Sequence, residues 1–458
     1  MRYTLQNILA GFCSPAGKIQ IASGIRYALR DTSGLLRTPV GRSQFIGGLR
    51  RRTWPVLGRM AALYRRHWVK DTRIVAVVGS CGKTTTMRAV SHSLGIPPHP
   101  MGHRNAWDWL ARSIFRIRPG DRHAVVEVGI DKVGQMLVYA NVVRPDVTVV
   151  TAIGSEHNRS LGTPEVTRAE KSLMVRALPV SGVAILNGDD PNVLWMKGLT
   201  RARVVTFGMD KANDVRASHI VPDWPKGTRF KVHLDGRVRD FHIRLTGRHM
   251  VYAALAGIAV AFVEGVDLDQ VAERLGRLTP TPRRLEPVQL ANGAFMLLDC
   301  EKAPLETIEA AFDTLSEIPA RRRIVVLGEV SEPPGSQGPV YRHLGERISQ
   351  VASKAILVCR KKSFRSYAGG ARRGGFPPHA LVDAGDNVLK AAEALRGDLG
   401  PGDVVLVKGR DTQRLDRVWL SLAGRTVRCD IDDCDVRAVV CESCPMLERG
   451  WKRLRVVI

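Results

Sequence analysis

The chain has 458 residues, of which 44% are hydrophobic and 25% are charged. These proportions are typical of a folded globular protein, and the length favours two or three domains over a single hydrophobic core. Because no apolar run approaches the roughly 18 residues of a membrane span and the N-terminus lacks a secretory signal, we expect a cytoplasmic protein.

The formal net charge is +25, from 69 Lys and Arg against 44 Asp and Glu. This charge is spread along the chain and no nucleic-acid-binding module is recognisable, so a specific nucleic-acid partner is not expected. Residues 1–71 are predicted to be a basic, mainly helical N-terminal segment. Its densest basic part, 50–66, has apolar residues at helical spacing. Such a helix packs against the next domain or makes weak contact with an anionic membrane surface.

A phosphate-binding loop is the most informative motif of the chain. The apolar run Ile74–Val78 predicts a buried strand, and the short loop after it leads to Lys83 and a predicted helix. Backbone N–H groups of such a loop and the helix N-terminus favour a phosphate chain. The usual first glycine is replaced by Val77, and an ordinary strand-to-helix turn is the alternative. We predict ATP bound with Mg²⁺ by Gly79, Ser80, Gly82, Lys83, Thr84 and Thr85.

Residues 72–278 are predicted to form a central ATP-binding domain of α/β class with a mostly parallel sheet. Strand-like runs alternate with helical ones and then give way to shorter alternating strands before an Ala-rich helical region at 249–276. The predicted strands are Ile74–Val78, Ala124–Val128, Val147–Ala152, Gly182–Leu186, Val204–Phe207, Phe230–Leu234 and Phe241–Leu245.

Pro280 and Pro282 mark a linker, and 279–426 is predicted to be a second, Rossmann-like α/β domain. Its expected strands are Phe295–Asp299, Arg323–Leu327, Ala355–Val358 and Asp403–Val407. A small cysteine-rich tail, 427–458, closes the chain.

Four further runs stand at the ends of predicted strands or in the helix that follows them. They are Val125–Gly129, Thr151–His157 with Leu161–Thr163 after it, Ala169–Lys171 and Leu186–Pro191. Together with the phosphate loop, and in this order, they resemble the Mur ligase family of ATP-dependent amide-bond-forming enzymes. Within that family the central domain is most similar to the D-alanyl-D-alanine-adding ligases. A short Gly-x-x-Gly-Lys-Thr loop is the family's own form, which accounts for Val77.

The resemblance implies a mechanism. A substrate carboxylate attacks the γ-phosphate of ATP, and an amine attacks the resulting acyl phosphate to give an amide, ADP and phosphate. Glu127 and His157 match Mg²⁺ ligands of the family, beside the Thr84 hydroxyl. Lys171 matches a lysine that members carbamylate to help hold a second Mg²⁺, and a plain surface lysine is the alternative.

In the second domain, Arg284 resembles part of a Gly-Arg-x-Glu turn, and Asp299 fits an acidic position that contacts ATP or its metal. Lys408 opens a Lys-Gly-Arg run that matches a loop facing the active site. The catalytic candidates are thus Lys83, His157, Lys171, Arg284 and Lys408. The resemblance places the protein in cell-wall or poly-amino-acid biosynthesis, with a small-molecule or peptide carboxylate and an amine as substrates.

Three departures from the family pattern stand out. Met250 and Ala253 occupy two asparagine positions associated with adenine, and the run 299–304 keeps only its ends. The N-terminal 70 residues show no UDP-sugar-binding domain.

Four of the eight cysteines lie together near the C-terminus. Their spacing favours a structural zinc site with four thiolate ligands, and free or redox-active thiols are the alternative. The expected Zn²⁺ ligands are Cys429, Cys434, Cys441 and Cys444.

Two other functions remain open from the sequence. A scaffold subunit that lost ligation would explain the altered adenine and 299–304 positions. A P-loop NTPase without ligase activity would leave the Glu127, His157 and Lys171 motifs unexplained.

Overall fold

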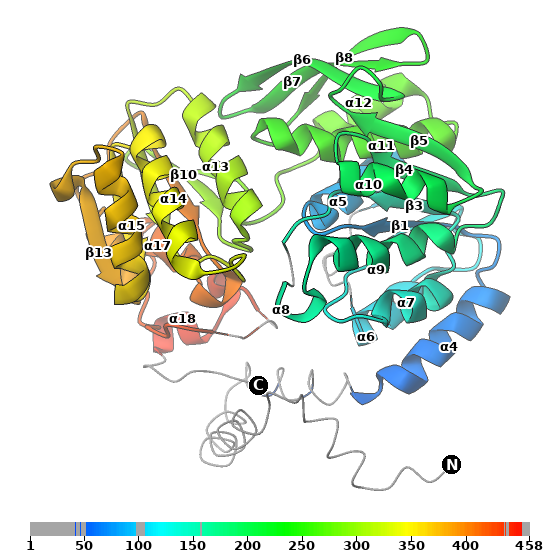
Figure 1. Cartoon of the computed structure of the whole chain (residues 1–458), viewed down its shortest axis with the longest axis horizontal. Helices are drawn as coiled ribbons and strands as arrows, with labels where there is room; N and C mark the ends of the chain where they lie inside the picture. Colours follow the sequence, from blue (N-terminus) through cyan, green and yellow to red (C-terminus); the bar gives the residue numbers. More distant parts are fainter. Residues whose placement is uncertain are drawn as a thin grey trace, which may run out of the picture.

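The computed structural model describes residues 42, 46, 52–97, 106–155, 158–434, 436 and 439–450. Two α/β units lie side by side in it, each built around one sheet (Figure 1). Within these ranges no helix is both long enough and apolar enough to span a bilayer. The prediction of two α/β domains with mostly parallel sheets is confirmed.

The first unit contains an eight-stranded sheet in the order β2-β1-β3-β4-β5-β6-β7-β8. The pairs from β2 through β6 are parallel, and β7 and β8 are added as antiparallel strands. The strands are β1 (Arg73–Val78), β2 (His123–Glu127), β3 (Val147–Val150), β4 (Val183–Asn187), β5 (Arg203–Gly208), β6 (Val215–Asp223), β7 (Gly227–Leu234) and β8 (Arg237–Ile243).

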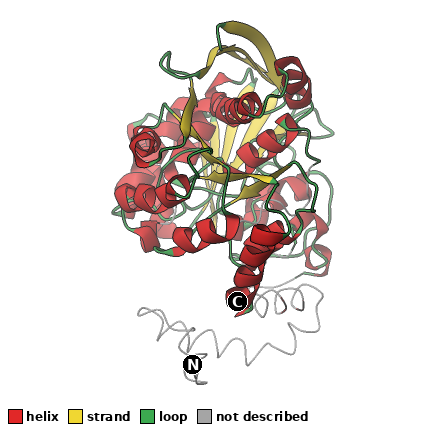
Figure 2. Cartoon of the chain, turned by 90° about the vertical axis from the view of Figure 1, so that its right-hand side faces the viewer, coloured by secondary structure: helices red, strands yellow, loops and turns green. Residues whose placement is uncertain are grey.

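Both faces of this sheet are covered, which explains the continuous apolar runs of its parallel strands. Val75 and Val77 of β1 belong to the hydrophobic cluster on one face. Ile74, Ala76 and Val78 belong to the cluster on the other. Figure 2 shows the strands enclosed between helices. The helices of this unit are α4 (Trp54–His67), α5 (Lys83–Ser93), α6 (Asp108–Phe115), α7 (Gln135–Val143), α8 (Asn158–Leu161), α9 (Pro164–Arg176), α10 (Pro191–Leu194), α11 (Val251–Val263) and α12 (Leu268–Gly276).

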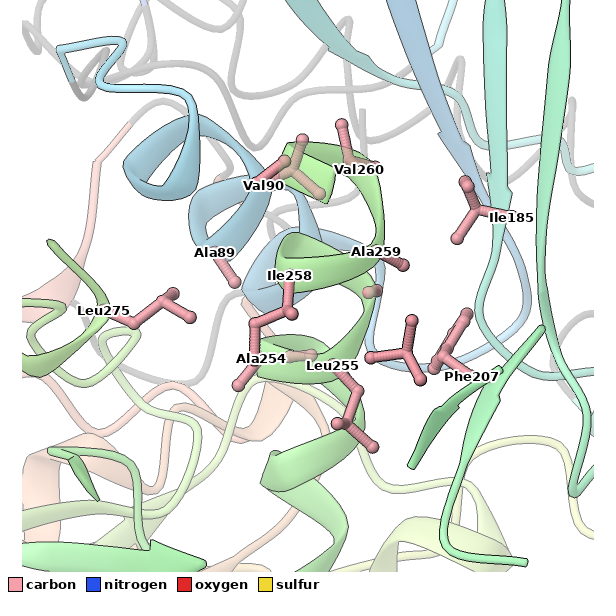
Figure 3. Packing of buried hydrophobic residues seen from close by; sticks show 14 of the residues in the cluster. Ala89, Val90, Ile185, Phe207, Ala254, Leu255, Ile258, Ala259, Val260 and Leu275 are labelled. Atoms are coloured by element: carbon pink, nitrogen blue, oxygen red, sulfur yellow. The ribbon is translucent and has the colours of Figure 1, made fainter. Parts of the chain in front are cut away.

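Helices α5 and α11 pack closely, and their contact fixes the helix that begins at the phosphate loop. Ala89 of α5 points toward Ala254 and Ile258 of α11 in the core, and Val90 lies beside Val260 (Figure 3). A Cβ added at Gly257 would lie 2.7 Å from Ser93 Oγ and 3.0 Å from the Ala89 carbonyl oxygen. The small residues of α11 therefore permit an approach that larger side chains would prevent.

The second unit contains a six-stranded sheet in the order β13-β12-β11-β14-β10-β9. All pairs are parallel except that of β10 with the edge strand β9. The strands are β9 (Glu286–Gln289), β10 (Phe295–Asp299), β11 (Arg322–Leu327), β12 (Lys354–Val358), β13 (Leu381–Gly385) and β14 (Asp403–Lys408). The helices are α13 (Leu305–Glu317), α14 (Gln337–Val351), α15 (Lys361–Arg373), α16 (Val388–Glu393), α17 (Asp416–Leu422) and α18 (Met446–Arg449).

Three strands were missed from the sequence. β9 and β13 are only partly buried, and β6 is exposed at alternate positions, so none has a continuous apolar run. β9 also contains Pro287. A proline argues against a strand when only the sequence is considered, but it is tolerated in an edge strand.

The basic helix predicted within 50–66 is α4, and it packs on the first unit. Trp54 stacks edge-on against Tyr139 of α7 with ring centroids 5.4 Å apart. The Arg65 side chain turns inward and donates to the carbonyl oxygens of Val143 and Arg144 and to Asp146. Most of the rest of the predicted N-terminal segment 1–71 lies outside the described residues.

Candidate active site

The phosphate loop leaves the carboxyl end of β1, between the ends of β2 and β3. Gly79 has φ +146°, and a Cβ there would lie 2.0 Å from Thr151 Oγ1, so glycine is required. Gly82, at φ +80°, caps the N-terminus of α5. The Ser80 N–H donates to the Ala152 carbonyl oxygen at 2.6 Å, which ties the loop to the end of β3. A short loop with a glycine at each end, at this helix N-terminus, fits a bound phosphate chain.

Lys83 is buried and folded back over this loop. Its Nζ donates to the carbonyl oxygens of Gly79 and Ser80, each at 2.8 Å. Burial lowers the pKa of Lys83, and the carboxylate of Glu127 opposes that shift. The ammonium group is thus held against the backbone of the loop that is expected to bind phosphate.

Glu127 and Thr84 offer oxygen ligands beside the loop. Glu127 ends β2, where it pairs in register with Val77 of β1, and its side chain is buried. The Thr84 side chain is also buried, in the first turn of α5. A carboxylate and a hydroxyl are hard oxygen donors and fit Mg²⁺. His157, the other expected Mg²⁺ ligand, lies outside the described residues.

Lys171 of α9 reaches the same loop from the other side. Its Nζ donates to Ser80 Oγ at 3.1 Å, and only 2% of the residue is exposed. Burial, and secondly the charge of Lys83, lower the pKa of Lys171 well below its usual range. The alternative of a plain surface lysine is therefore wrong.

The linker and the start of the second unit contact α5 directly. Thr85 and Thr281 share a hydrogen bond between hydroxyl oxygens 3.2 Å apart. Arg284 Nη2 donates to Thr84 Oγ1 at 3.4 Å. These contacts bring a guanidinium group from the second unit to the phosphate loop.

Asp299 and Lys408 form a buried ion pair at the carboxyl ends of β10 and β14. They are register partners, and Lys408 Nζ lies 2.6 Å from Asp299 Oδ2. The same Nζ donates to the Lys302 carbonyl oxygen at 2.8 Å. Burial raises the pKa of Asp299, while Lys408 and Arg284 act against that shift. In this arrangement, Lys408 holds the Asp299 carboxylate and the loop after β10 in place.

Lys302 is a candidate that the sequence did not reveal. Burial, and secondly the positive charge of Lys83, lower the pKa of Lys302 to about 8, with Cys81 and Glu127 opposing. Its pKa thus responds to charges of the phosphate loop and of Glu127. Lys302 lies in the run that departs from the family pattern, so no motif drew attention to it.

Ser155 and Glu306 form a second link between the two units. Glu306, in the first turn of α13, accepts hydrogen bonds from the Ser155 N–H at 2.9 Å and from Ser155 Oγ at 2.8 Å. Both residues line a cavity of about 660 Å³ between the units, together with Thr163, Asn192, Glu332 and Gln337. This cavity is large enough for a small peptide or amino acid.

Around the expected adenine positions the structure has different contacts. Met250 precedes α11, and Ala253 is buried within it. The neighbouring Tyr252 hydroxyl donates to Asp189 Oδ2 at 2.8 Å. Asp189 also accepts from the Met209 N–H and from Asn213 Nδ2, and these donors help to lower the pKa of its carboxyl against the effect of burial.

The four clustered cysteines line one small cavity in the C-terminal tail. Among the described residues, no group of three or more His, Cys, Asp and Glu side chains stands in an arrangement that holds a metal ion. The zinc prediction therefore has no support from the side-chain geometry as it stands.

Two protein-family models match the chain. The Mur ligase middle domain matches residues 77–261, and the Mur ligase glutamate ligase domain matches residues 283–410. The UDP-N-acetylmuramoyl-tripeptide–D-alanyl-D-alanine ligase of Mycobacterium bovis is 30% identical over 372 residues, which cover 75% of this chain and 72% of the relative. The Escherichia coli ligase of the same name is 27% identical over 303 residues, covering 65% and 67%.

Solved structures show the same fold. MurF from Acinetobacter baumannii superposes with a TM-score of 0.71 at 21% identity, covering 81% of each chain. MurF from Thermotoga maritima, solved with ADP, gives a TM-score of 0.70 at 21% identity, covering 81% of this chain and 84% of its own. The order of the units, the phosphate loop and these matches lead to one conclusion: the chain belongs to the Mur ligase family.

Proposed function

We propose that the protein is an ATP-dependent carboxylate–amine ligase that forms an amide bond through an acyl phosphate. The observation that carries this proposal is the meeting of cations from both units at one loop. Lys83 and Lys171 come from the first unit, and Arg284 comes from the second. The pKa of Lys302, also in the second unit, responds to the charge of Lys83. A carboxylate nucleophile brings a second anion to the phosphates, whereas the water used by an NTPase is uncharged, so cations from both units suit ligation.

The chemistry needs charge neutralisation more than covalent help from the protein. When the substrate carboxylate attacks the γ-phosphorus, the phosphoryl oxygens keep their negative charge. Lys83, Arg284 and Lys302 would offset that charge and bring two anions together. Mg²⁺, held by Thr84 and Glu127 with His157, would supply further neutralisation when bound.

Lys171 is proposed as a carbamylated residue. CO₂ adds to an uncharged amine, and the buried position of Lys171 beside Lys83 favours that form. The product is a carboxylate, with one proton released, and it would lie beside Ser80 at the phosphate loop. Mass spectrometry of the native protein would show the added CO₂, and Lys171→Ala removes it.

The inter-unit cavity is proposed as the place where the organic substrates meet. Its walls carry Glu306 and Glu332, which suit a cationic ammonium group before it loses a proton and attacks. The relatives are named as D-alanyl-D-alanine ligases, so D-alanyl-D-alanine is the first amine to test. The carboxylate substrate is to be sought among muramyl peptides and shorter acidic peptides.

The direct test is ADP release measured across pairs of carboxylates and amines. The proposal predicts that ADP release needs both substrates. It should fall by at least about a thousandfold in Lys83→Ala, since the positive charge that stabilises the transferred phosphoryl group is lost. Lys362→Ala, at an exposed lysine of α15, is the matched control and should keep full activity.

Three outcomes would contradict the proposal. Undiminished turnover in Lys83→Ala rules out this loop as the nucleotide site. ADP release that needs no amine indicates an NTPase. Failure of purified protein to bind ATP with Mg²⁺ favours the scaffold subunit.

A further inference from the structure

The cysteine-rich tail closes over a small cavity on the second unit. This cavity of about 20 Å³ has walls made of all four clustered cysteines, two arginines and four apolar residues. We call it the cysteine cavity. Its lining is Cys429, Cys434, Cys441, Cys444, Arg414, Arg417, Ile431, Val436, Met446 and Leu447.

Local backbone structure brings the cysteines together from both halves of the tail. Cys441 and Cys444 flank one turn, closed by the Cys444 N–H donating to the Cys441 carbonyl oxygen at 3.1 Å. The Cys429 N–H donates to the Leu447 carbonyl oxygen at 3.1 Å, which sets the first half of the tail against the second. A Cys-x-x-Cys turn facing another cysteine pair is the usual layout of a thiolate metal site.

The tail has little else to hold it folded. Its own hydrophobic cluster contains two buried residues, Ile431 and Val436, and its only α-helix in the described part is the four-residue α18. A segment with so small a core normally needs a disulfide or a metal ion. All four cysteines are free thiols in the structure. Four free thiols that line one cavity can form such a cross-link by sharing a metal ion.

Two buried arginines give the cysteine cavity a positive surrounding. Arg417 is 1% exposed and Arg414 is 6% exposed. Arg417 Nη1 donates to the Cys429 carbonyl oxygen at 2.7 Å and approaches Cys429 Sγ at 3.7 Å. Arg414 donates to the Val436 carbonyl oxygen, and Asp416, two residues further along the chain, is buried as well. Four thiolates around a divalent ion carry two net negative charges, which neighbouring guanidinium groups stabilise.

We propose that Cys429, Cys434, Cys441 and Cys444 bind one thiol-seeking divalent cation of the Zn²⁺ class. In the structure the sulfur atoms line the cavity walls without forming a ligand set. Binding therefore requires the side chains to turn inward until each sulfur lies about 2.3 Å from a common ion. Each thiol loses its proton to solvent in the process. With four protein ligands the ion has no open position, so the site is structural.

The site also connects to the candidate active site. The Cys434 N–H donates to the Thr412 carbonyl oxygen at 2.7 Å, and Arg417 donates to the Gln413 carbonyl oxygen at 3.1 Å. Thr412 and Gln413 lie in the loop that follows Lys408. The bound ion would thus fix the tail against a loop that leads out of the active site.

Metal content of the full chain, purified without chelator under reducing conditions, tests the proposal. We expect about one zinc per chain by elemental analysis. The double variant Cys434→Ser/Cys444→Ser should lose the metal, whereas Cys359→Ala, which alters a buried cysteine outside the tail, should retain it. Replacement by Co²⁺ should give the sulfur-to-metal charge-transfer absorption of a tetrahedral thiolate site.

Two results would overturn the proposal. One is a metal-free protein with four reactive thiols in the tail, or with disulfides there, that takes up neither Zn²⁺ nor Co²⁺. The other is equal metal content in the double variant. Unfolding of the double variant is separated from loss of the site by circular dichroism, because the two α/β units have cores of their own. The Co²⁺ spectrum of the unaltered chain tests the ligands without any substitution.

Discussion

At the residue scale, the active-site motifs were predictable where backbone geometry restricts the residue type. Gly79 can only be glycine, because any Cβ meets Thr151, and so the loop was recognisable without its usual first glycine. Lys302 was not predictable, since the Lys83 charge that helps to lower its pKa belongs to the other unit and no local pattern encodes it. Met250 and Ala253 were recognised as departures from the family's two asparagines. Tyr252, which lies between them in the chain, donates a hydrogen bond to Asp189.

Lys302 gives a pH prediction at this scale. With its pKa lowered to about 8, Lys302 is cationic below that pH and loses its proton above it. If its charge assists phosphoryl transfer, kcat/KM falls as pH rises through 8, because the neutral amine no longer offsets the phosphoryl charge. The ratio kcat/KM is the quantity to follow, since it reports the pKa values of the free enzyme. Arginine stays protonated, so Lys302→Arg should move this alkaline limb upward by at least about one pH unit.

The measurement is a kcat/KM profile from pH 6 to about 10 with ADP release as the readout. Lys362→Arg, at an exposed lysine, is the control and should leave the profile unchanged. An alkaline limb that Lys302→Arg does not move would show that another group titrates there.

At the element scale, strands with continuous apolar runs were predicted well, and partly exposed ones were not. β1 and β14 are buried along almost their whole length and were read directly from the sequence. β6, β9 and β13 have mixed burial and were missed. Helix pairing also escaped prediction, because it depends on glycines whose role appears only when two helices are in contact.

Helices α14 and α15 show this most clearly. A Cβ at Gly370 of α15 would lie 1.8 Å from the Arg342 carbonyl oxygen of α14. At the adjacent Gly369, an added Cβ would meet nothing within 4 Å. Gly370→Ala should therefore lower the free energy of unfolding by about 1–3 kcal/mol or more, since backbone must move. Gly369→Ala should be neutral or stabilise by up to about 1 kcal/mol.

Urea unfolding of the two alanine variants checks this prediction. Since the substitutions are chemically identical and one residue apart, the difference between them reports the helix contact alone. Equal stability of the two variants would show that α14 and α15 are not packed as described.

At the scale of the whole molecule, residues of the second unit complete the surroundings of the phosphate loop. The first unit alone contributes Lys83, Glu127 and Lys171 to the proposed nucleotide site. Contacts of Arg284 with Thr84 and of Glu306 with Ser155 place the second unit against that site. Family membership could be recognised from ordered motifs, but the inter-unit cavity could not, because its walls come from segments far apart in the chain.

The proposed reaction predicts the path of one oxygen atom. In ligation through an acyl phosphate, a carboxylate oxygen becomes bonded to the γ-phosphorus. When the amine attacks the carbonyl carbon, the carbon–oxygen bond breaks and that oxygen leaves with phosphate. Hydrolysis by an NTPase would instead place a solvent oxygen on the phosphate.

The most direct test uses the carboxylate that supports the fastest ADP release, labelled with ¹⁸O in its carboxyl group, together with its amine partner. The phosphate produced is then analysed by mass spectrometry or by ³¹P NMR. The proposed ligase predicts one labelled oxygen in each phosphate and a labelled oxygen retained in the amide. Phosphate free of label, with its new oxygen drawn from water, would contradict the account.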